Sequence, residues 1–570
     1  MPSNETIIMQ GATYHMDEES TPSIWSLNYF SLLFCTVISV VLVLFYLYII
    51  KPYVFLPADI LSFAETNFVG DIIKLRIGEP IYTVPEDNNS LLYTPGAQIL
   101  TYAISWLIGQ KTSIVVWRII QLFFVTCAAL LATFCCRILQ KLIYNAKQFP
   151  FAKTWLVFTF FTLFLAATAP RISTFAHTLQ SEALSLFVSV FSLFTILFYL
   201  RFPNWKRIVL MAICPALGYF TKQNLLCWLI LMFVVLVLHD FRNFKHLALF
   251  IFTSGISSVI VFGICYWRWG DAFIFWTFEI LGGARKKISF SPSAFHLSIP
   301  RCIDHLIRAW MEIAIGFVGG ILLLRGRGIK KFGPIFVAWI LLICLEALIS
   351  SVNWGPLYHF GPGVVIGVIF LLSALPQIWP YTRMTRDNDV SLLIYNWGKP
   401  LIAVAGVMTI FIALHVVPTG DKHEARYWKQ QSLSDVYRYI RDIENEFDGL
   451  PADQVLLDIG NWIYLRHSVL IKDRAISLAD QPPGGIYENM YVMVDRIRRK
   501  TYKKILVRDL HSPFFPYDWF SWEKPSGVRD ALLKYYNEVR TIPAVEENAS
   551  PMIRNMQAGP VSVLVPKSNP

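Results

Sequence analysis

The sequence carries little charge for its length. Only 16% of its 570 residues are Asp, Glu, Lys or Arg, whereas soluble domains average about 25%. Apolar residues make up 55% of the chain and come in long blocks. The block at 32–50 approaches the ~20 residues that a helix needs to cross a bilayer. The shortage of charge therefore excludes an entirely soluble protein and indicates a polytopic integral membrane protein.

The N-terminal region lacks the features of a cleaved signal peptide. The residues before the first apolar block are acidic rather than basic, and no small-residue cleavage site follows the block. We therefore expect a short tail over 1–24 and a first membrane helix that is retained.

The cysteines lack any spacing typical of a metal or redox site. There are nine, most of them lie inside apolar segments, and none follows Cys344. Free cysteine is commonly buried, so we expect these residues to serve packing.

The net charge of +11 does not indicate nucleic-acid binding, because Lys and Arg gather in short loops between apolar blocks. That distribution follows the positive-inside rule for membrane helices. We predict eleven membrane segments, at 25–50, 114–139, 151–169, 179–200, 208–220, 225–238, 247–267, 310–324, 332–351, 360–379 and 401–417. Two of them, 208–220 and 225–238, are shorter than the ~17 residues of a full span, and we expect tilted or broken helices there.

With this assignment the five basic connections all lie on one side of the membrane, which should be the cytoplasm. The agreement requires 94–109 to lie at the outer interface, or to dip into it, without crossing. The tail 1–24 is then cytoplasmic. The loops 51–111 and 268–308 and the C-terminal region 418–570 are then extracytoplasmic.

The region 418–570 is expected to form a small α/β domain. The segments 454–459 and 504–508 are typical of short buried strands, 487–500 has helical character, and 560–566 is a candidate last strand. Strands that alternate with helices favour an α/β unit. The region contains neither a cysteine nor a Gly-rich phosphate loop, so we expect no disulfide and no catalysis there.

The first outer loop carries the most specific pattern. Asp59 stands where the first helix leaves the membrane, and partial desolvation there suits a carboxylate that accepts a proton. A solvated Asp at a helix end is the alternative. Further along the loop come Gly78 and Tyr82, and then Tyr93 and Pro95 at the turn that leads into the interfacial segment.

More elements follow in order along the chain. Arg118 lies near the start of the second predicted span, and Glu182 lies near the start of the fourth. Lys222 ends a Leu-Gly-x-x-Thr-Lys stretch, and Tyr358 and His359 belong to a Tyr-His-Phe-Gly-Pro turn.

These elements and their order resemble the GT-C superfamily of membrane glycosyltransferases that use polyprenyl-phosphate sugars. The superfamily includes protein O-mannosyltransferases, aminoarabinose transferases, and arabinofuranosyl- and mannosyltransferases. The resemblance implies a polytopic α-helical membrane domain of GT-C type over 25–417, with about eleven transmembrane helices. A small extracytoplasmic α/β domain would follow. The chain departs from the family pattern at Ile60, Thr94 and Glu182, where relatives have Glu, Pro and Asp. Gln180 is the alternative to Glu182 at the position of the second acid.

The resemblance implies an inverting transfer of a sugar to an acceptor hydroxyl, with Asp59 as general base. Lys222 would bind the donor phosphate; the alternative is a side chain that snorkels to the interface. His359 would donate a hydrogen bond to the same phosphate or serve structure. Arg118 would bind the phosphate or anchor the outer loop.

Other residues have supporting roles by the same resemblance. Arg285 and Lys286 would bind the donor phosphate or face anionic lipid head groups. Glu182, Tyr82, Tyr93 and Tyr358 would position the donor or acceptor, and pairing with Arg171 is the alternative for Glu182. Asp71 and Asp271 are rival carboxylates by location. The outer loops contain no Asp-x-Asp pair and the family's lipid-phosphate branch usually needs no metal, so we expect neither a metal nor a cofactor.

Two other functions compete with a glycosyltransferase. A transporter or flippase of lipid-linked saccharides would explain the spans, but it predicts a repeat symmetry that the sequence lacks. A non-enzymatic scaffold for envelope assembly is the other. The expected partners are a polyprenyl-phosphate sugar, a glycan, lipid or protein acceptor, and membrane lipids in a bacterial plasma (inner) membrane, without nucleic acid.

Overall fold

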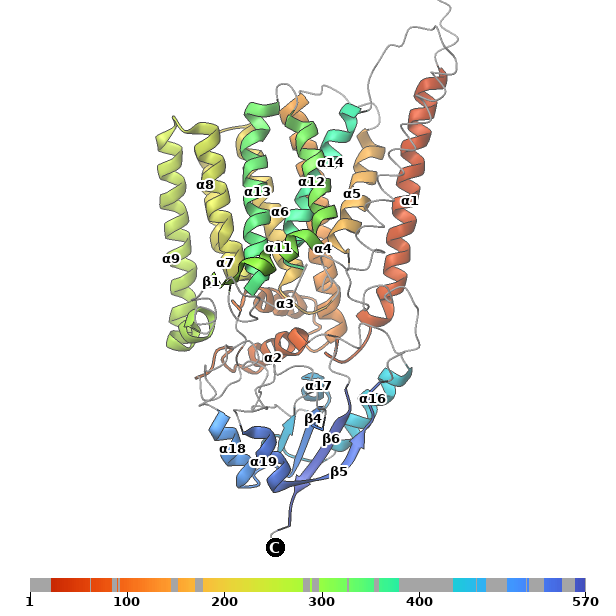
Figure 1. Cartoon of the computed structure of the whole chain (residues 1–570), viewed down its shortest axis with the longest axis vertical. Coiled ribbons are helices and arrows are strands. Elements are labelled where there is room, and N and C mark those ends of the chain that lie inside the picture. Colours follow the sequence, from red (N-terminus) through yellow and green to blue (C-terminus); the bar gives the residue numbers. More distant parts are fainter. Residues whose placement is uncertain are drawn as a thin grey trace, which may run out of the picture.

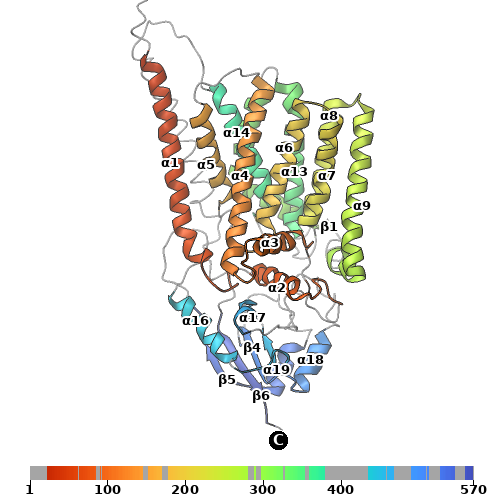
Figure 2. The ribbon, with the colours of Figure 1, turned by 180° about the vertical axis from the view of Figure 1, so that it is seen from behind.

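Long helices stand side by side in a bundle, and a small α/β unit lies beyond one end of it (Figure 1, Figure 2). Two short helices lie crosswise between the bundle and this unit. The structure is a computed structural model. It describes residues 22–61, 63–84, 90, 93–144, 152–169, 178–279, 288–289, 297–324, 328–352, 358–378, 434–447, 449–457, 459–467, 490–508, 510–511, 527–545 and 559–568.

The bundle is built from the apolar blocks of the sequence. Its helices are α1 (Pro22–Val54), α4 (Ile114–Tyr144), α5 (Ala152–Ala167), α6 (Glu182–Arg201), α7 (Trp205–Thr221), α8 (Cys227–Asp240), α9 (Phe244–Ile274), α12 (Trp310–Leu324), α13 (Gly328–Val352) and α14 (Gly361–Ile378). A short amphipathic helix, α11 (Ile299–Arg308), precedes α12 and is bent from it by 71°. Every predicted membrane segment from 25–50 to 360–379 coincides with one of them. The predicted segment 401–417 lies outside the described residues.

These helices indicate a multi-pass membrane protein. By length and apolar character, six helices of the described part are able to cross a membrane, or seven if the bent pair α11 and α12 forms one span. The apolar helices α5 and α14 are shorter. Helix α7 contains Pro215 and is followed at once by a break, as expected for one of the two short predicted segments. The total of about eleven spans stays a prediction.

Glycines let helices α12 and α14 pack backbone against backbone. A Cβ atom on Gly319 would lie 2.3 Å from the main-chain nitrogen of Leu371, and one on Gly367 would lie 2.8 Å from the Cα atom of Gly316. Helices in lipid gain stability from such close packing, because lipid tails are as apolar as the helix surface. Small residues at this crossing therefore hold the two helices together.

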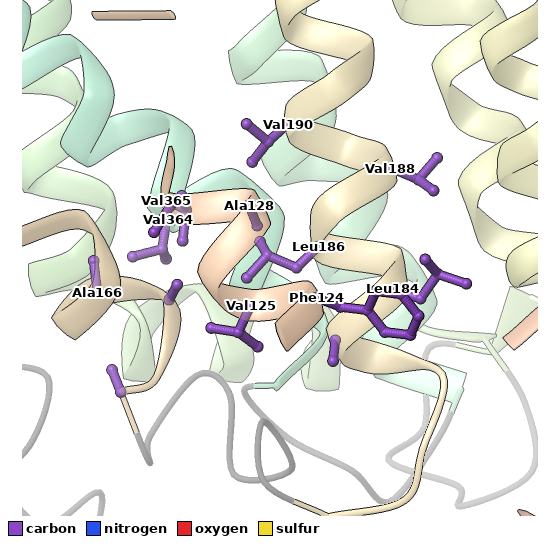
Figure 3. Close-up of a cluster of buried hydrophobic side chains, with 14 of the residues drawn as sticks. Phe124, Val125, Ala128, Ala166, Leu184, Leu186, Val188, Val190, Val364 and Val365 are labelled. Carbon is purple, nitrogen blue, oxygen red and sulfur yellow. The ribbon is translucent and has the colours of Figure 1, made fainter. Parts of the chain in front are cut away.

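Helices α4, α6 and α14 share an aliphatic core. Figure 3 shows Val125 of α4, Leu186 of α6 and Val365 of α14 among the labelled side chains of this core. All three are buried. This layer fixes the ends of α6 and α14 that carry polar residues.

Two short helices of the first outer loop, α2 (Phe63–Ile77) and α3 (Gly96–Leu107), lie across the end of the bundle (Figure 1). Helix α3 has 12 residues, fewer than a membrane span requires. This arrangement agrees with the expectation that 94–109 does not cross.

The second outer loop begins inside helix α9, which is kinked at Gly270, where φ is +58°. A π-helical turn, η4 (Phe275–Glu279), follows the helix. Strands β1 (Ile288–Ser289) and β2 (Leu297–Ser298) then pair in parallel ahead of α11.

The C-terminal unit contains a mixed four-stranded sheet in the order β3-β4-β6-β5. The strands are β3 (Val455–Leu457), β4 (Lys504–Arg508), β5 (Tyr536–Ile542) and β6 (Val561–Pro566), and the helices are α16 (Ser434–Glu444), α17 (Trp462–His467), α18 (Met490–Arg498) and α19 (Val528–Tyr535). Strands β3 and β4 are parallel, whereas β6 runs antiparallel to both β4 and β5.

The predicted strands at 454–459, 504–508 and 560–566 are confirmed as β3, β4 and β6. Strand β5 was not predicted, because only its two end residues are buried and its sequence shows no apolar alternation.

Candidate active site

A pocket with mostly apolar walls and a few polar side chains lies where α5, α6, α8, α13 and α14 meet, at the end of the bundle next to α3. It measures about 620 Å³, including space open to the surroundings. Its polar lining includes Glu182, Lys222, Asn224, Glu346 and His359. Three of these, Glu182, Lys222 and His359, are site residues predicted from the sequence. Segments more than 170 positions apart in the chain therefore contribute to one pocket.

A break between two helices positions Lys222. Helix α7 ends at Thr221, Lys222 is extended (φ −162°, ψ 132°), and the short helix η3 (Gln223–Leu226) leads into α8. The turn is tight, because a Cβ atom on Gly218 would lie 3.0 Å from Cβ of Leu225. The Leu-Gly-x-x-Thr-Lys stretch thus forms a turn that holds a lysine inside the bundle.

Lys222 and Glu182 form a buried ion pair. The Lys222 Nζ atom lies 2.6 Å from Glu182 Oε1, and the two side chains are 7% and 14% exposed. The Nζ atom also lies 5.3 Å from the centre of the Tyr93 ring, within the range of a cation–π interaction. A charge at this depth needs such partners. Arg171, the predicted alternative partner of Glu182, lies outside the described residues.

Tyr82 and Tyr93 fix the first outer loop against this pair. The Tyr82 hydroxyl donates to the main-chain oxygen of Tyr93 at 2.5 Å. Burial raises the pKa of Tyr82 well above its usual value, and the nearby Asp71 carboxylate raises it further. Tyr82 therefore stays a neutral phenol and a hydrogen-bond donor.

The next residues of the loop are clamped onto the end of α7. The Thr94 hydroxyl donates to the main-chain oxygen of Tyr219 at 2.7 Å. Gly96 lies so close to Phe220 of α7 that a Cβ atom on the glycine would lie 2.4 Å from the main-chain oxygen of Phe220. This contact places Tyr93 beside Lys222.

His359 belongs to the short helix η5 (Tyr358–Phe360), which leads into α14. Its side chain is 6% exposed and lines the pocket. The Tyr358 side chain is not among those described.

Asp59 lies outside the pocket, against the C-terminal unit. Its two carboxylate oxygens accept hydrogen bonds from the main-chain N–H groups of Asn461 and Trp462, both at 2.8 Å. The Asn461 amide in turn donates to the oxygen of Thr66 at 2.8 Å. Asp59 is fully buried and caps the start of α17.

Arg118 anchors the first outer loop. Its guanidinium binds both carboxylate oxygens of Glu65, each at 2.8 Å. Its remaining N–H groups donate to the main-chain oxygens of Tyr53, Leu56 and Ala58. All five guanidinium donors are thereby engaged and the side chain is fully buried. This geometry favours the anchoring alternative over binding of a donor phosphate.

The remaining sequence candidates are dispersed. Arg285 and Lys286 lie outside the described residues. Asp71 pairs with Lys74 at 3.6 Å and accepts a hydrogen bond from Gln98. Asp271 is exposed and accepts one from Tyr266.

Sequence reasoning missed Glu346 and Asn224 in the pocket and Glu65 beside Arg118. A lone carboxylate in an otherwise apolar span is a functional candidate by default, and this signal identifies Glu346 within 332–351. Asn224 directly follows the recognised Lys222 stretch. Glu65 has no comparable signal. Within the described residues, His, Cys, Asp and Glu side chains form no group of three that would hold a metal ion.

Comparison with known proteins identifies the fold. No protein-family model matches the sequence, and no curated protein sequence matches it significantly. Among solved structures, ArnT from Cupriavidus metallidurans bound to undecaprenyl phosphate is similar, with a TM-score of 0.52 and 13% identity over 92% of this chain and 97% of that one. The apo state of ArnT gives a TM-score of 0.53.

A second similar protein is archaeal. The oligosaccharyltransferase AglB from Archaeoglobus fulgidus, in complex with an inhibitory peptide and a dolichol-phosphate, gives a TM-score of 0.50. Its identity is 10% over 90% of this chain and 73% of that one. The chain therefore has the fold of GT-C glycosyltransferases, as the sequence resemblance predicted.

Proposed function

We propose that the protein is an integral membrane glycosyltransferase that moves a sugar from a polyprenyl-phosphate donor to an acceptor hydroxyl. The observation that carries the proposal is the meeting of Glu182, Lys222 and His359 in one pocket. The fold adds support, because the similar structures were solved with undecaprenyl phosphate or dolichol-phosphate.

Lys222 is the cation for the leaving group in this proposal. When the bond from the anomeric carbon to the phosphate oxygen breaks, its electrons stay on the lipid phosphate. A fixed cation in a water-poor site stabilises that growing charge more than it would in bulk water. His359 adds a hydrogen bond to the phosphate. The ion pair with Glu182 keeps Lys222 in place before the donor binds.

Asp59 is the proposed general base. It takes the proton from the acceptor hydroxyl as that oxygen attacks the anomeric carbon from the side opposite the phosphate, so the configuration inverts. Both Asp59 oxygens are occupied by Asn461 and Trp462 in this structure. We therefore propose that the start of α17 withdraws when an acceptor binds, and that the present conformation is the closed one.

The proposed location is the plasma (inner) membrane, with the pocket, α2, α3 and the C-terminal unit on the extracytoplasmic face. The positive-inside distribution of Lys and Arg supports this orientation.

The test is transfer by purified protein. Radiolabelled polyprenyl-phosphate sugars are incubated with candidate protein, lipid and glycan acceptors. We expect transfer by the wild type, its loss in Lys222→Ala, and unchanged transfer in Lys245→Ala, whose side chain is exposed. Scrambling of the labelled lipid across vesicle membranes without any transfer would contradict the proposal and favour a flippase.

A further inference from the structure

Glu346 is a buried carboxylate inside an apolar helix. It is 5% exposed, and it is the only charged residue of α13 after Lys331. Burial of such a group in a membrane helix is costly, so an ionisable residue there is a functional candidate by default. Glu346 lines the pocket, so its carboxylate adjoins the space proposed for the donor.

Helix α14 makes room for this carboxylate and holds one of its oxygens. The main-chain N–H of Gly363 donates to Glu346 Oε1 at 3.1 Å. A Cβ atom on Gly363 would lie 2.4 Å from Glu346 Oε2. The Trp339 ring nitrogen fixes the same glycine by donating to its main-chain oxygen at 2.7 Å. Glu346 is therefore held in a fixed position.

Three buried side-chain oxygens in this pocket have no hydrogen-bond partner among the described residues. They are Glu182 Oε2, Asn224 Oδ1 and Glu346 Oε2. They come from three separate elements, α6, η3 and α13, and their residues line the same cavity. Buried polar atoms without a hydrogen-bond partner are costly and rare in native proteins. The arrangement is suited to a ligand that carries several hydroxyl groups, each of which can donate or accept a hydrogen bond.

We propose that these three oxygens bind the sugar ring of the donor through its hydroxyl groups. The inference rests on the proposed function and adds the substrate class. Lys222 is the only lysine or arginine among the described residues that line the pocket, and the phosphate would occupy it, so the pocket offers no second cation for the carboxylate of an acidic sugar. The phosphate lies on the Lys222 side of the pocket and the uncharged, hydroxyl-rich sugar on the Glu346 side.

Binding of donor lipids by the full-length protein tests this inference without knowledge of the acceptor. The probes are sugar-free undecaprenyl phosphate, undecaprenyl-phosphate glucose, galactose and mannose, and undecaprenyl-phosphate glucuronic acid. For the wild type we expect at least one neutral hexose to tighten binding about 10- to 100-fold over the sugar-free lipid, the range for hydrogen bonds to charged groups. Undecaprenyl-phosphate glucuronic acid should bind no more tightly than the sugar-free lipid.

Two variants separate a binding role from a structural one. Glu346→Gln should lose most of the gain that the hexose provides while it keeps the affinity for the sugar-free lipid. Asn224→Leu should reduce the same gain, and it serves as the test if Glu346→Gln does not fold. Lys222→Ala should weaken the binding of the sugar-free lipid and of the lipid-linked hexose to the same extent.

The possible outcomes distinguish failure of the proposed function from failure of this inference alone. If the wild type binds neither the sugar-free lipid nor any of the lipid-linked sugars, the proposed function fails and this inference fails with it. If the wild type binds the lipids but no hexose adds affinity, or if a folded variant keeps the full gain, the inference fails alone. Preferential binding of glucuronic acid would also overturn it.

Discussion

The Asp59 carboxylate accepts a hydrogen bond from the main-chain N–H of Trp462 at 2.8 Å, across 403 positions of the chain. The contact joins the first outer loop to the C-terminal unit. Gly460 allows it, because a Cβ atom there would lie 2.8 Å from Asp59 Oδ1 and 2.3 Å from the Trp462 ring. The proposed base is therefore covered by a segment built to fit closely over it.

Asp59→Asn should abolish transfer and loosen this contact. The new NH2 group opposes one of the two main-chain donors, so a hydrogen bond to a charged acceptor is lost. Amide hydrogen exchange at Asn461 and Trp462 should speed up about 10- to 100-fold, as measured by mass spectrometry. Asp271→Asn, in an exposed carboxylate, is the control and should change neither property. Normal transfer by a folded Asp59→Asn protein would remove Asp59 from the mechanism.

Arg118→Met should destabilise the protein by about 3–5 kcal/mol, because it leaves the Glu65 carboxylate buried without its cation. The free energy of unfolding in detergent measures this. The control is Arg308→Met, whose partner Asp304 is 49% exposed; such exposed pairs contribute about 0–1 kcal/mol. Equal stability of the two variants would show that the Arg118 cluster does not hold the outer loop.

Glu182→Gln should bind sugar-free undecaprenyl phosphate more tightly than the wild type, by roughly threefold to tenfold, about 0.7–1.4 kcal/mol. The reason is that the carboxylate 2.6 Å from Lys222 competes with a phosphate for the same cation. Lipid-binding assays at two salt concentrations measure the change. Unaltered or weaker binding would indicate that the phosphate does not use Lys222.

Gly96→Ala should destabilise the protein by about 1–3 kcal/mol, because the added methyl group would collide with the main-chain oxygen of Phe220. The collision should displace the segment that also contains Tyr93, which lies beside Lys222, and so weaken donor binding. Gly255→Ala and Gly263→Ala, in helix α9 with open space around them, are matched controls that should keep wild-type stability. Tolerance of Gly96→Ala would mean that α3 does not pack on α7 as described.

Much of the bundle was predictable, because long apolar blocks have few ways to fold in a membrane. The turn that carries Lys222 was also recognisable, since Gly218 and the lysine form one local stretch. The ion pair between Lys222 and Glu182 was not predictable, because the two residues are 40 positions apart and nothing in the sequence indicates that they meet in the fold.

Other features depend on contacts that only the folded chain reveals. The capping of α17 by Asp59 joins segments some 400 positions apart. Arg118 could be predicted to be buried, but its choice between Glu65 and a phosphate depended on where α2 packs. Glu346 did carry a sequence signal, a single charge in an apolar span.

The most direct test of the central claim is a structure of the protein with a bound polyprenyl-phosphate sugar. The account predicts the phosphate within hydrogen-bond distance of Lys222 Nζ and the sugar in the pocket beside Glu346. A lipid phosphate bound elsewhere, with the pocket empty and the Lys222–Glu182 pair unchanged, would contradict it.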